Sequence, residues 1–229
     1  MKNIINSGQF KKGHKNSEEI RKKIRKSQLL EGLKLIGSPA HIPDCSRTDL
    51  PQFFVDQGYK AGAEIGVYKG GFTKRFCEAG LKMFAVDPWT AYYGDRDQGR
   101  VDSIYEEACK TLSPYSNCTI IKKSSMEATG DIPNLSLDFV YIDSDHRFKQ
   151  TAEDIVEWSK KVRSGGVVAG HDYFTSLPWA RKFRCQVKAV VDAYAKAFGY
   201  DNFYTLGDLD HITEPEWMQW TLSWFWIKK

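Results

Sequence analysis

The sequence lacks long hydrophobic runs and a cysteine framework. No stretch of its 229 residues approaches the roughly 20 apolar residues that span a bilayer. Its N-terminus, Met-Lys-Asn followed by mainly polar residues, shows no signal peptide. The five cysteines are scattered and include no Cys-x-x-Cys pair, which argues against a disulfide framework and a structural zinc site. We therefore expect a cytoplasmic protein that does not contact a membrane.

The length of the chain fits one domain with an appendage. Apolar residues make up 41% of it, which excludes a wholly disordered chain. A helix is predicted over residues 17–35, because Asn16 and Glu19 form a capping-box pattern and an apolar stripe follows. A Gly-Ser-Pro sequence ends this helix. We therefore divide the chain into a basic appendage over residues 1–37 and a folded domain over residues 38–229.

Positive charge is concentrated near the N-terminus. Residues 1–28 carry nine Lys and Arg against two Glu, whereas the rest of the chain carries 24 basic and 27 acidic side chains. Residues 8–24 resemble the modular DNA-binding segments attached to phage homing endonucleases, although no HNH or GIY-YIG nuclease core follows them. The resemblance implies a phage-like origin, a location in a host cytoplasm, and a nucleic-acid contact through residues 1–28. A solvated tail is the alternative interpretation.

Apolar runs alternate with helical stretches from residue 61 onward, which predicts an α/β fold of the Rossmann-like kind. Strands are expected at 63–67, 83–87, 118–122, 137–143, 166–169, 203–206 and 221–228. Helices are expected at 71–79, 98–112, 148–162 and 179–198. The last two strands follow each other without a helix and are predicted to form an antiparallel hairpin. The expected architecture is a mostly parallel, seven-stranded sheet with helices on both faces.

Residues after the first two of these strands indicate an adenosine-type cofactor. Ligands bind outside the carboxyl ends of strands in an open parallel sheet. Gly66, Gly70 and Gly71 let the backbone approach a ligand at a helix N-terminus. Asp87 lies 21 residues beyond Gly66, a spacing typical of an acid that binds ribose hydroxyls. The glycine spacing departs from Gly-x-Gly-x-x-Gly, and Glu64 would repel a pyrophosphate but accept from an ammonium group, which argues against a nicotinamide dinucleotide.

The same residues resemble a known family. Glu-Ile-Gly-Val-x-x-Gly, with Val-Asp downstream, looks like the first motif and the second-strand acid of class I S-adenosylmethionine-dependent methyltransferases. The resemblance covers residues 60–228 and includes the terminal hairpin. It implies S-adenosyl-L-methionine as the cofactor, with Ser125 and Met126 in the segment that contacts adenine. The cofactor-binding residues that it implies are Glu64, Gly66, Tyr68, Gly70, Gly71, Asp87, Ser125, Met126 and Asp143.

Two later segments are similar to a narrower group. Residues 138–146 and 165–173 resemble relatives of catechol and macrocin O-methyltransferases. In that group, acids after the fourth and fifth strands hold a divalent metal beside the acceptor hydroxyl. Asp143 and Asp172 match these acids, so the resemblance implies Mg²⁺ or Mn²⁺ at these residues. The catechol-type pattern has Asp-Asn where this sequence has His171-Asp172, which is a departure in the ligand set.

Two histidines stand where methyl transfer needs a base. Methyl transfer to an alcohol is an in-line displacement on a sulfonium carbon, so the hydroxyl must lose its proton. A metal lowers the pKa of a bound hydroxyl, and a nearby base can accept the proton. His146 and His171 each lie just past a predicted strand end and near an Asp. A hydrogen-bonded structural histidine is the alternative for each. The predicted catalytic set is Asp143, His146, His171 and Asp172.

The expected acceptor is a small molecule or a sugar. A nucleic-acid methyltransferase is the second interpretation, although the sequence has no Asp-Pro-Pro-Tyr or Asn-Pro-Pro-Tyr/Phe motif after the fourth strand and no Pro-Cys nucleophile. A non-catalytic nucleic-acid binder is the third. Salt-dependent DNA binding through residues 1–28 would favour the second or third, and salt-insensitive turnover of a small acceptor would favour the first.

Overall fold

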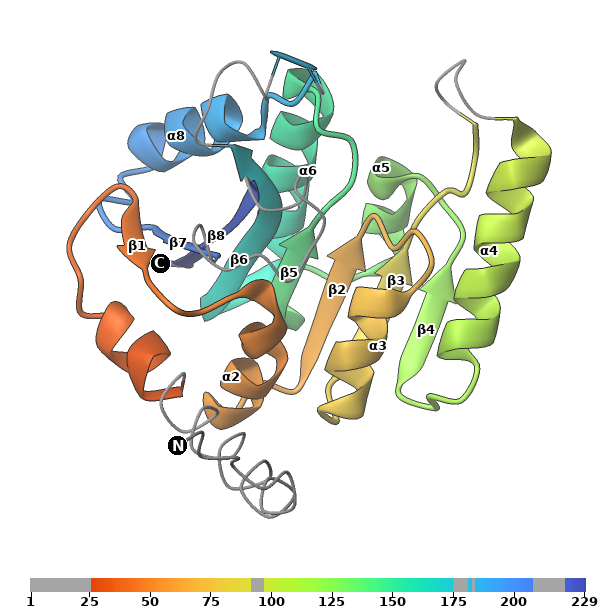
Figure 1. Cartoon of the computed structure of the whole chain (residues 1–229), viewed down its shortest axis with the longest axis horizontal. Coiled ribbons are helices and arrows are strands. Elements are labelled where there is room, and N and C mark those ends of the chain that lie inside the picture. The colour runs from red at the N-terminus through yellow and green to blue at the C-terminus, as the bar shows by residue number, and fades with distance from the viewer. Residues whose placement is uncertain (1–25, 92–96, 175–180, 183, 208–220) are drawn as a thin grey trace, which may run out of the picture.

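An eight-stranded sheet forms the centre of the molecule (Figure 1). The computed structural model describes residues 26–91, 97–174, 181–182, 184–207 and 221–229. The strands are β1 (Ala40–Ile42), β2 (Ala61–Ile65), β3 (Lys82–Val86), β4 (Cys118–Ile121), β5 (Leu137–Ile142), β6 (Val162–Phe174), β7 (Tyr204–Leu206) and β8 (Thr221–Ile227). Their order across the sheet is β1-β7-β8-β6-β5-β2-β3-β4. The neighbours from β4 to β6 are parallel, and β8 runs antiparallel to both β6 and β7.

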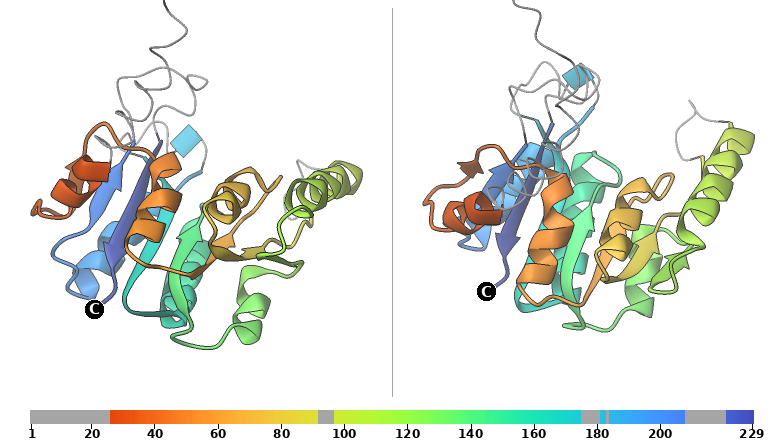
Figure 2. Two further views of the ribbon diagram at one scale, coloured as in Figure 1. Left: turned by 90° about the horizontal axis from the view of Figure 1, so that it is seen from below. Right: turned by 60° about the horizontal axis from the view of Figure 1, so that its bottom comes forward.

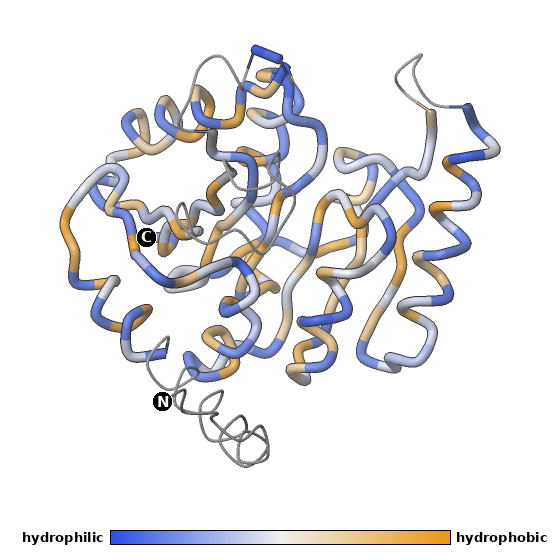
Figure 3. Tube along the Cα trace, viewed as in Figure 1, coloured by the Kyte–Doolittle hydropathy of each residue, from blue (hydrophilic) through white to orange (hydrophobic). Residues whose placement is uncertain are grey.

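Helices cover both faces of this sheet, as the two views of Figure 2 show. They are α2 (Leu50–Asp56), α3 (Gly71–Glu78), α4 (Gln98–Leu112), α5 (Ser125–Ala128), α6 (Phe148–Lys161) and α8 (Val187–Ala197), with 3₁₀ turns η1 (Arg47–Asp49) and η2 (Thr129–Asp131). Apolar residues of α5, α6 and α8 share one core cluster with the sheet, and those of α2 and α3 share another. Figure 3 shows the alternation of hydrophobic and hydrophilic residues along α4, which buries one side only.

The parallel sheet, the terminal hairpin and helices on both faces confirm the fold predicted from the sequence. The predicted strand count of seven is wrong, because β1 adds an eighth strand beside β7. This strand has only three residues, which is too short to give a recognisable alternation of apolar and polar side chains. Its pairing with β7 joins segments that are 164 residues apart at His41 and Thr205.

Several predicted boundaries also move. Strand β6 runs from Val162 to Phe174 and not from 166 to 169. Its pairing with β5 shifts register across the Gly-rich stretch, where Gly165 has φ of 73°. Helix α8 begins at Val187, although residues 181–182 are helical. Of the helix predicted over 17–35, the described part is helical at residues 26–32, and its earlier residues lie outside the described part of the chain. No helix within the described ranges is long and apolar enough to cross a membrane.

Candidate active site

The carboxyl ends of four parallel strands place the predicted residues at one edge of the sheet. The last residues of β2, β3 and β5 are in register, and the end of β5 is in register with Gly170 of β6. The next residue along each of these strands therefore lies at a common level. These residues are Gly66, Asp87, Asp143 and His171.

The glycine turn after β2 requires glycine for steric reasons. Gly66 has φ of 90°, and a Cβ placed on it would lie 2.2 Å from the carbonyl oxygen of Asp143. The backbones after β2 and β5 thus approach each other more closely than any side chain permits. Gly70 also has a positive φ, of 80°, and stands at the N-terminus of α3, which begins at Gly71. A Cβ on Gly71 would meet nothing within 4 Å, so this position is open.

Asp87 holds the turn in place. One of its carboxylate oxygens accepts from the backbone N–H groups of Val67 and Tyr68, at 2.9 and 3.0 Å, and the other accepts from that of Trp89 at 2.8 Å. Trp89 in turn donates from its indole nitrogen to the carbonyl of Tyr68 at 2.8 Å. Tyr68 and Trp89 both adopt positive φ, of 54° and 44°. Such backbone strain is typical of ligand-binding segments. That Asp87 binds the ribose hydroxyls of the cofactor stays a prediction.

Glu64, on β2 before the glycine turn, is buried. Only 2% of the residue is exposed, and its carboxyl group accepts a hydrogen bond from the hydroxyl of Thr73 on α3. Burial raises its pKa to about 8, while the Thr73 hydrogen bond acts in the opposite direction and the charge of Asp143 adds to the rise. The group is therefore mostly protonated at neutral pH. Its predicted contact with an ammonium group stays a prediction.

A buried acid on α6 connects the loops after β4 and β5. Asp154 is 1% exposed and accepts hydrogen bonds from the hydroxyls of Ser125 and Ser144, the latter at 2.5 Å. Trp158 donates from its indole nitrogen to the Ser125 hydroxyl at 2.8 Å. The Ser125 side chain thus faces this network, and Met126 beside it packs partly buried against the core. Sequence analysis did not find Asp154, although its spacing from Trp158 places both on the inward face of the helix.

Three of the predicted catalytic residues form a compact cluster. One ligand atom each of Asp143, His146 and Asp172 lies within 4.8 Å of the other two, a grouping that suits a metal ion. Asp172 pairs with Nδ1 of His146 at 3.1 Å and with Nδ1 of His171 at 3.4 Å. It holds these contacts from a backbone with φ of 57°. The four predicted catalytic residues are therefore brought together, and the two histidines contact different carboxylate oxygens of Asp172.

The pKa values of the two acids of the cluster shift in opposite directions. Burial would raise the pKa of Asp172, but its hydrogen bond with His171 and the nearby His146 outweigh burial and hold this pKa well below its usual range. Burial raises the pKa of Asp143, and repulsion from Asp172 adds to that rise, against the opposing charges of the histidines and Arg47. Asp172 is thus the stronger anion of the pair.

Arg47 enters the site from outside the predicted motifs. It lies in η1, which Ser46 and Asp49 cap reciprocally. Its guanidinium pairs with the carboxylate of Asp143 at 3.3 Å and lies 5.3 Å from the ring centroid of Phe72. No periodicity or motif points to this residue, since it comes from 96 positions upstream of its partner.

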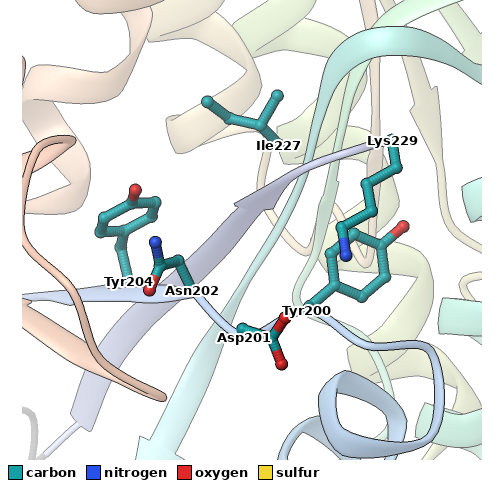
Figure 4. Close-up of a pocket in the computed structure, with 6 residues that line it drawn as sticks. All are labelled: Tyr200, Asp201, Asn202, Tyr204, Ile227 and Lys229. Atoms are coloured by element: carbon teal, nitrogen blue, oxygen red, sulfur yellow. The ribbon is translucent and has the colours of Figure 1, made fainter.

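A small hollow at the opposite edge of the sheet is distinct from this cluster (Figure 4). Its volume is about 270 Å³. It lies where β7 begins and β8 ends, and both points are at the amino ends of the parallel strands. Its lining residues are Tyr200, Asp201, Asn202, Tyr204, Ile227 and Lys229. None of the predicted site residues is among them.

The strand order, the terminal hairpin and the glycine turn define the α/β Rossmann-like fold of class I methyltransferases. A family described as "Methyltransferase domain" matches residues 63–173, which hold the glycine turn and all four predicted catalytic residues. Arg47 lies outside the matched range.

Solved structures of methyltransferases share the fold at low sequence identity. An O-methyltransferase from Bacillus cereus, in complex with SAH, is 11% identical with a TM-score of 0.58, and the match covers 80% of each chain. An rRNA methylase from Streptococcus thermophilus is 14% identical with a TM-score of 0.55, over 81% of this chain and 98% of the other. One neighbour is described as an O-methyltransferase and the other as an rRNA methylase, so the fold alone does not select an acceptor.

Among curated proteins, an uncharacterized protein y4gI from Sinorhizobium fredii is 28% identical over 117 residues. The match covers 48% of this chain but only 12% of that protein. These comparisons give no support to the homing-endonuclease resemblance of residues 8–24, which also lie outside the described residues.

Proposed function

We propose that the protein is an S-adenosylmethionine-dependent methyltransferase that methylates a hydroxyl oxygen of a small molecule or a sugar with the help of a divalent metal. The cluster of Asp143, His146 and Asp172 carries this proposal, because it stands beside the glycine turn at the same edge of the sheet. A site that binds the methyl donor would thus adjoin groups that can activate an alcohol. The matched family and the fold support the methyltransferase class.

The donor set of the cluster fits a divalent transition metal. A six-coordinate ion holds its ligands at about 2.1 Å, so that opposite ligand atoms stand roughly 4.2 Å apart. The three ligand atoms lie within 4.8 Å of one another, and small movements would bring them to this geometry. Two carboxylates with one imidazole suit Mn²⁺ better than Mg²⁺, which prefers oxygen ligands. The bound ion would lower the pKa of the acceptor hydroxyl.

His171 is the proposed base. Asp172 accepts from its Nδ1, and in that tautomer Nε2 carries the lone pair that accepts the hydroxyl proton. The indole of Trp224 donates to the His171 carbonyl at 3.0 Å and fixes its backbone. Bound S-adenosylmethionine would supply the methyl group to the acceptor oxygen, with its sulfur keeping the electron pair of the broken bond. His171 would hold the proton released by the hydroxyl.

Calorimetric titration with S-adenosylhomocysteine, with NAD as the control, tests the cofactor class. We expect micromolar binding of S-adenosylhomocysteine and none of NAD. Asp87→Ala should lose this binding because the turn loses its anchor, whereas Asp172→Ala should keep it. Asp138→Ala is a matched control, because this acid accepts backbone N–H bonds at the opposite edge of the sheet. Unchanged binding in Asp87→Ala would contradict the proposed cofactor site.

Titration with Mn²⁺ alone, followed by calorimetry or electron paramagnetic resonance, tests the metal. We expect wild type to bind Mn²⁺ more tightly than Mg²⁺, and both Asp172→Ala and His146→Ala to bind Mn²⁺ at least 10-fold more weakly, as loss of a ligand implies. Equal Mn²⁺ affinity in wild type and Asp172→Ala would refute the metal site. Methyl uptake by hydroxylated acceptors, measured with and without Mn²⁺, then tests the reaction itself.

A nucleic-acid acceptor is the second candidate, favoured by the excess positive charge of residues 1–28. The test compares the full chain with a variant that lacks residues 1–25. If this candidate is correct, oligonucleotide affinity falls steeply with salt, and the deletion removes that dependence. Methyl uptake by the oligonucleotide separates a nucleic-acid methyltransferase from a non-catalytic binder.

A further inference from the structure

The segment between β1 and α2 brings a cation to an otherwise acidic edge. Figure 1 shows the chain crossing in front of β6 on its way from β1 to α2. Arg47 lies on this stretch, in a turn fixed by the Ser46 capping box, where the carboxylate of Asp49 accepts from the Ser46 N–H at 2.8 Å. The Ser46 capping box that follows β1 therefore fixes the position of Arg47.

The contacts of Arg47 place it between the end of β5 and α3. Nη1 lies 3.3 Å from Asp143 Oδ2, and the guanidinium carbon lies 5.3 Å from the ring centroid of Phe72. The side chain keeps 32% of its surface exposed, so it is neither free in solvent nor closed off. The guanidinium also hydrogen-bonds with the Tyr141 side chain, and its five N–H donors leave others for a second carboxylate.

Arg47 offsets negative charge at this edge, as the proposed divalent metal would. Asp87 follows β3, Asp143 follows β5, and Asp172 lies near the carboxyl end of β6. S-adenosylmethionine has a carboxylate at its amino-acid end, and the carboxylates of these acids would repel it. Lys69, the cation within the glycine turn, is directed away, since its ammonium pairs with Glu107 of α4 at 2.8 Å.

We propose that Arg47 binds the carboxylate of S-adenosylmethionine, so that the segment before the matched domain completes the cofactor site. This inference rests on the proposed function. The guanidinium would bridge Asp143 on one side and the cofactor carboxylate on the other. Arginine suits this task because its fork presents several N–H donors in one plane.

A paired titration separates this role from a structural one. The two ligands are S-adenosylmethionine and decarboxylated S-adenosylmethionine, which differ by the carboxylate alone. We expect Arg47→Ala to bind S-adenosylmethionine roughly 10- to 30-fold more weakly, as expected for a charge-assisted hydrogen bond, and the decarboxylated ligand unchanged within about twofold. Arg47→Lys, which keeps the charge without the fork, should fall between wild type and Arg47→Ala.

The matched control is Arg163→Ala. Arg163 also pairs with an acid, Asp138, at 2.7 Å, and also lies over a ring, that of Tyr59, at 5.4 Å. It makes these contacts at the opposite edge of the sheet, so its loss should change stability but neither affinity. Thermal unfolding of both variants gives the common baseline of structural damage.

Each outcome decides between the proposals. Failure of wild type to bind S-adenosylmethionine would overturn the proposed function itself. If wild type binds but Arg47→Ala binds equally well, the inference about Arg47 is wrong while the function stands. An equal loss of affinity for both ligands would show that Arg47 acts only by holding Asp143, which also overturns the carboxylate contact.

Discussion

Replacing Glu64 with Gln should make the protein less sensitive to alkaline pH. The carboxyl group has a pKa of about 8 in the folded protein against 4.5 as its ordinary value, because it is buried beside Thr73. An acid with a raised folded pKa binds its proton more tightly in the folded state. Its contribution is therefore most favourable below pH 4.5 and is lost as the pH rises towards 8.

The size of the effect follows from the two pKa values. Between pH 5 and pH 8, wild type should lose about 3.5 kcal/mol of unfolding free energy through Glu64, at 1.36 kcal/mol per pKa unit. Glu64→Gln does not titrate and lacks this loss. For a domain of this size, the difference between the variants in unfolding temperature should grow by roughly 7 to 14 °C over the same range.

Thermal and urea unfolding of wild type and Glu64→Gln at pH 5, 6, 7 and 8 measures this difference. The slope with pH is the decisive quantity, because the amide costs a constant amount wherever its N–H groups lack acceptors. Titrations of all other groups are common to both proteins and cancel. Parallel curves for the two proteins would refute the argument that Glu64 is protonated when folded. Saturating S-adenosylhomocysteine should flatten the wild-type slope if its ammonium group contacts Glu64.

Three further predictions concern buried polar groups and the turn. Asp138 accepts hydrogen bonds from two backbone N–H groups and from Arg163, and these contacts outweigh its burial and hold its pKa below 3.8. Asp138→Asn should therefore remove a contribution to stability that is present above that pH and is lost on acidification. Urea unfolding at pH 3 to 7 measures this change. Asp154→Ala should weaken S-adenosylhomocysteine binding by calorimetry and destabilise by about 2–4 kcal/mol, because Ser125 and Ser144 lose their acceptor, and unchanged affinity would contradict this. Gly66→Ala should abolish that binding, since its Cβ would overlap the Asp143 carbonyl.

The sequence predicted those parts of the site that follow from strand order. Parallel strands bring their carboxyl ends to one edge, so the acids after β3 and β5 and near the end of β6 could be placed together without coordinates. The glycines could be placed for the same reason, since a strand that turns into a helix beside another backbone needs them. These positions depend only on local pattern and on the regular geometry of α/β units.

The remaining features depend on contacts between distant segments. Arg47 reaches Asp143 from 96 residues away, and β1 is three residues long, so neither leaves a periodic signal. The inward-facing hydroxyl of Ser125 follows from its partner on α6, which the strand pattern does not specify. Asp154 did leave a signal, because it stands four residues before Trp158 on a helix whose other inward residues are mostly apolar.

Pairing between β1 and β7 delays completion of the sheet during synthesis. The strands from β2 to β6 all lie between these two segments in the chain and pair with one another, and β6 also pairs with the later β8. Strand β1 must wait until β7 and then β8, which joins β7 to β6, have left the ribosome. Closing the long loop between β1 and β7 carries the largest entropic cost in the sheet. A nascent chain shorter than this would hold the glycine turn and the acids while the segment that bears Arg47 had no edge to dock on. The cation of the site therefore arrives last, although it is encoded first.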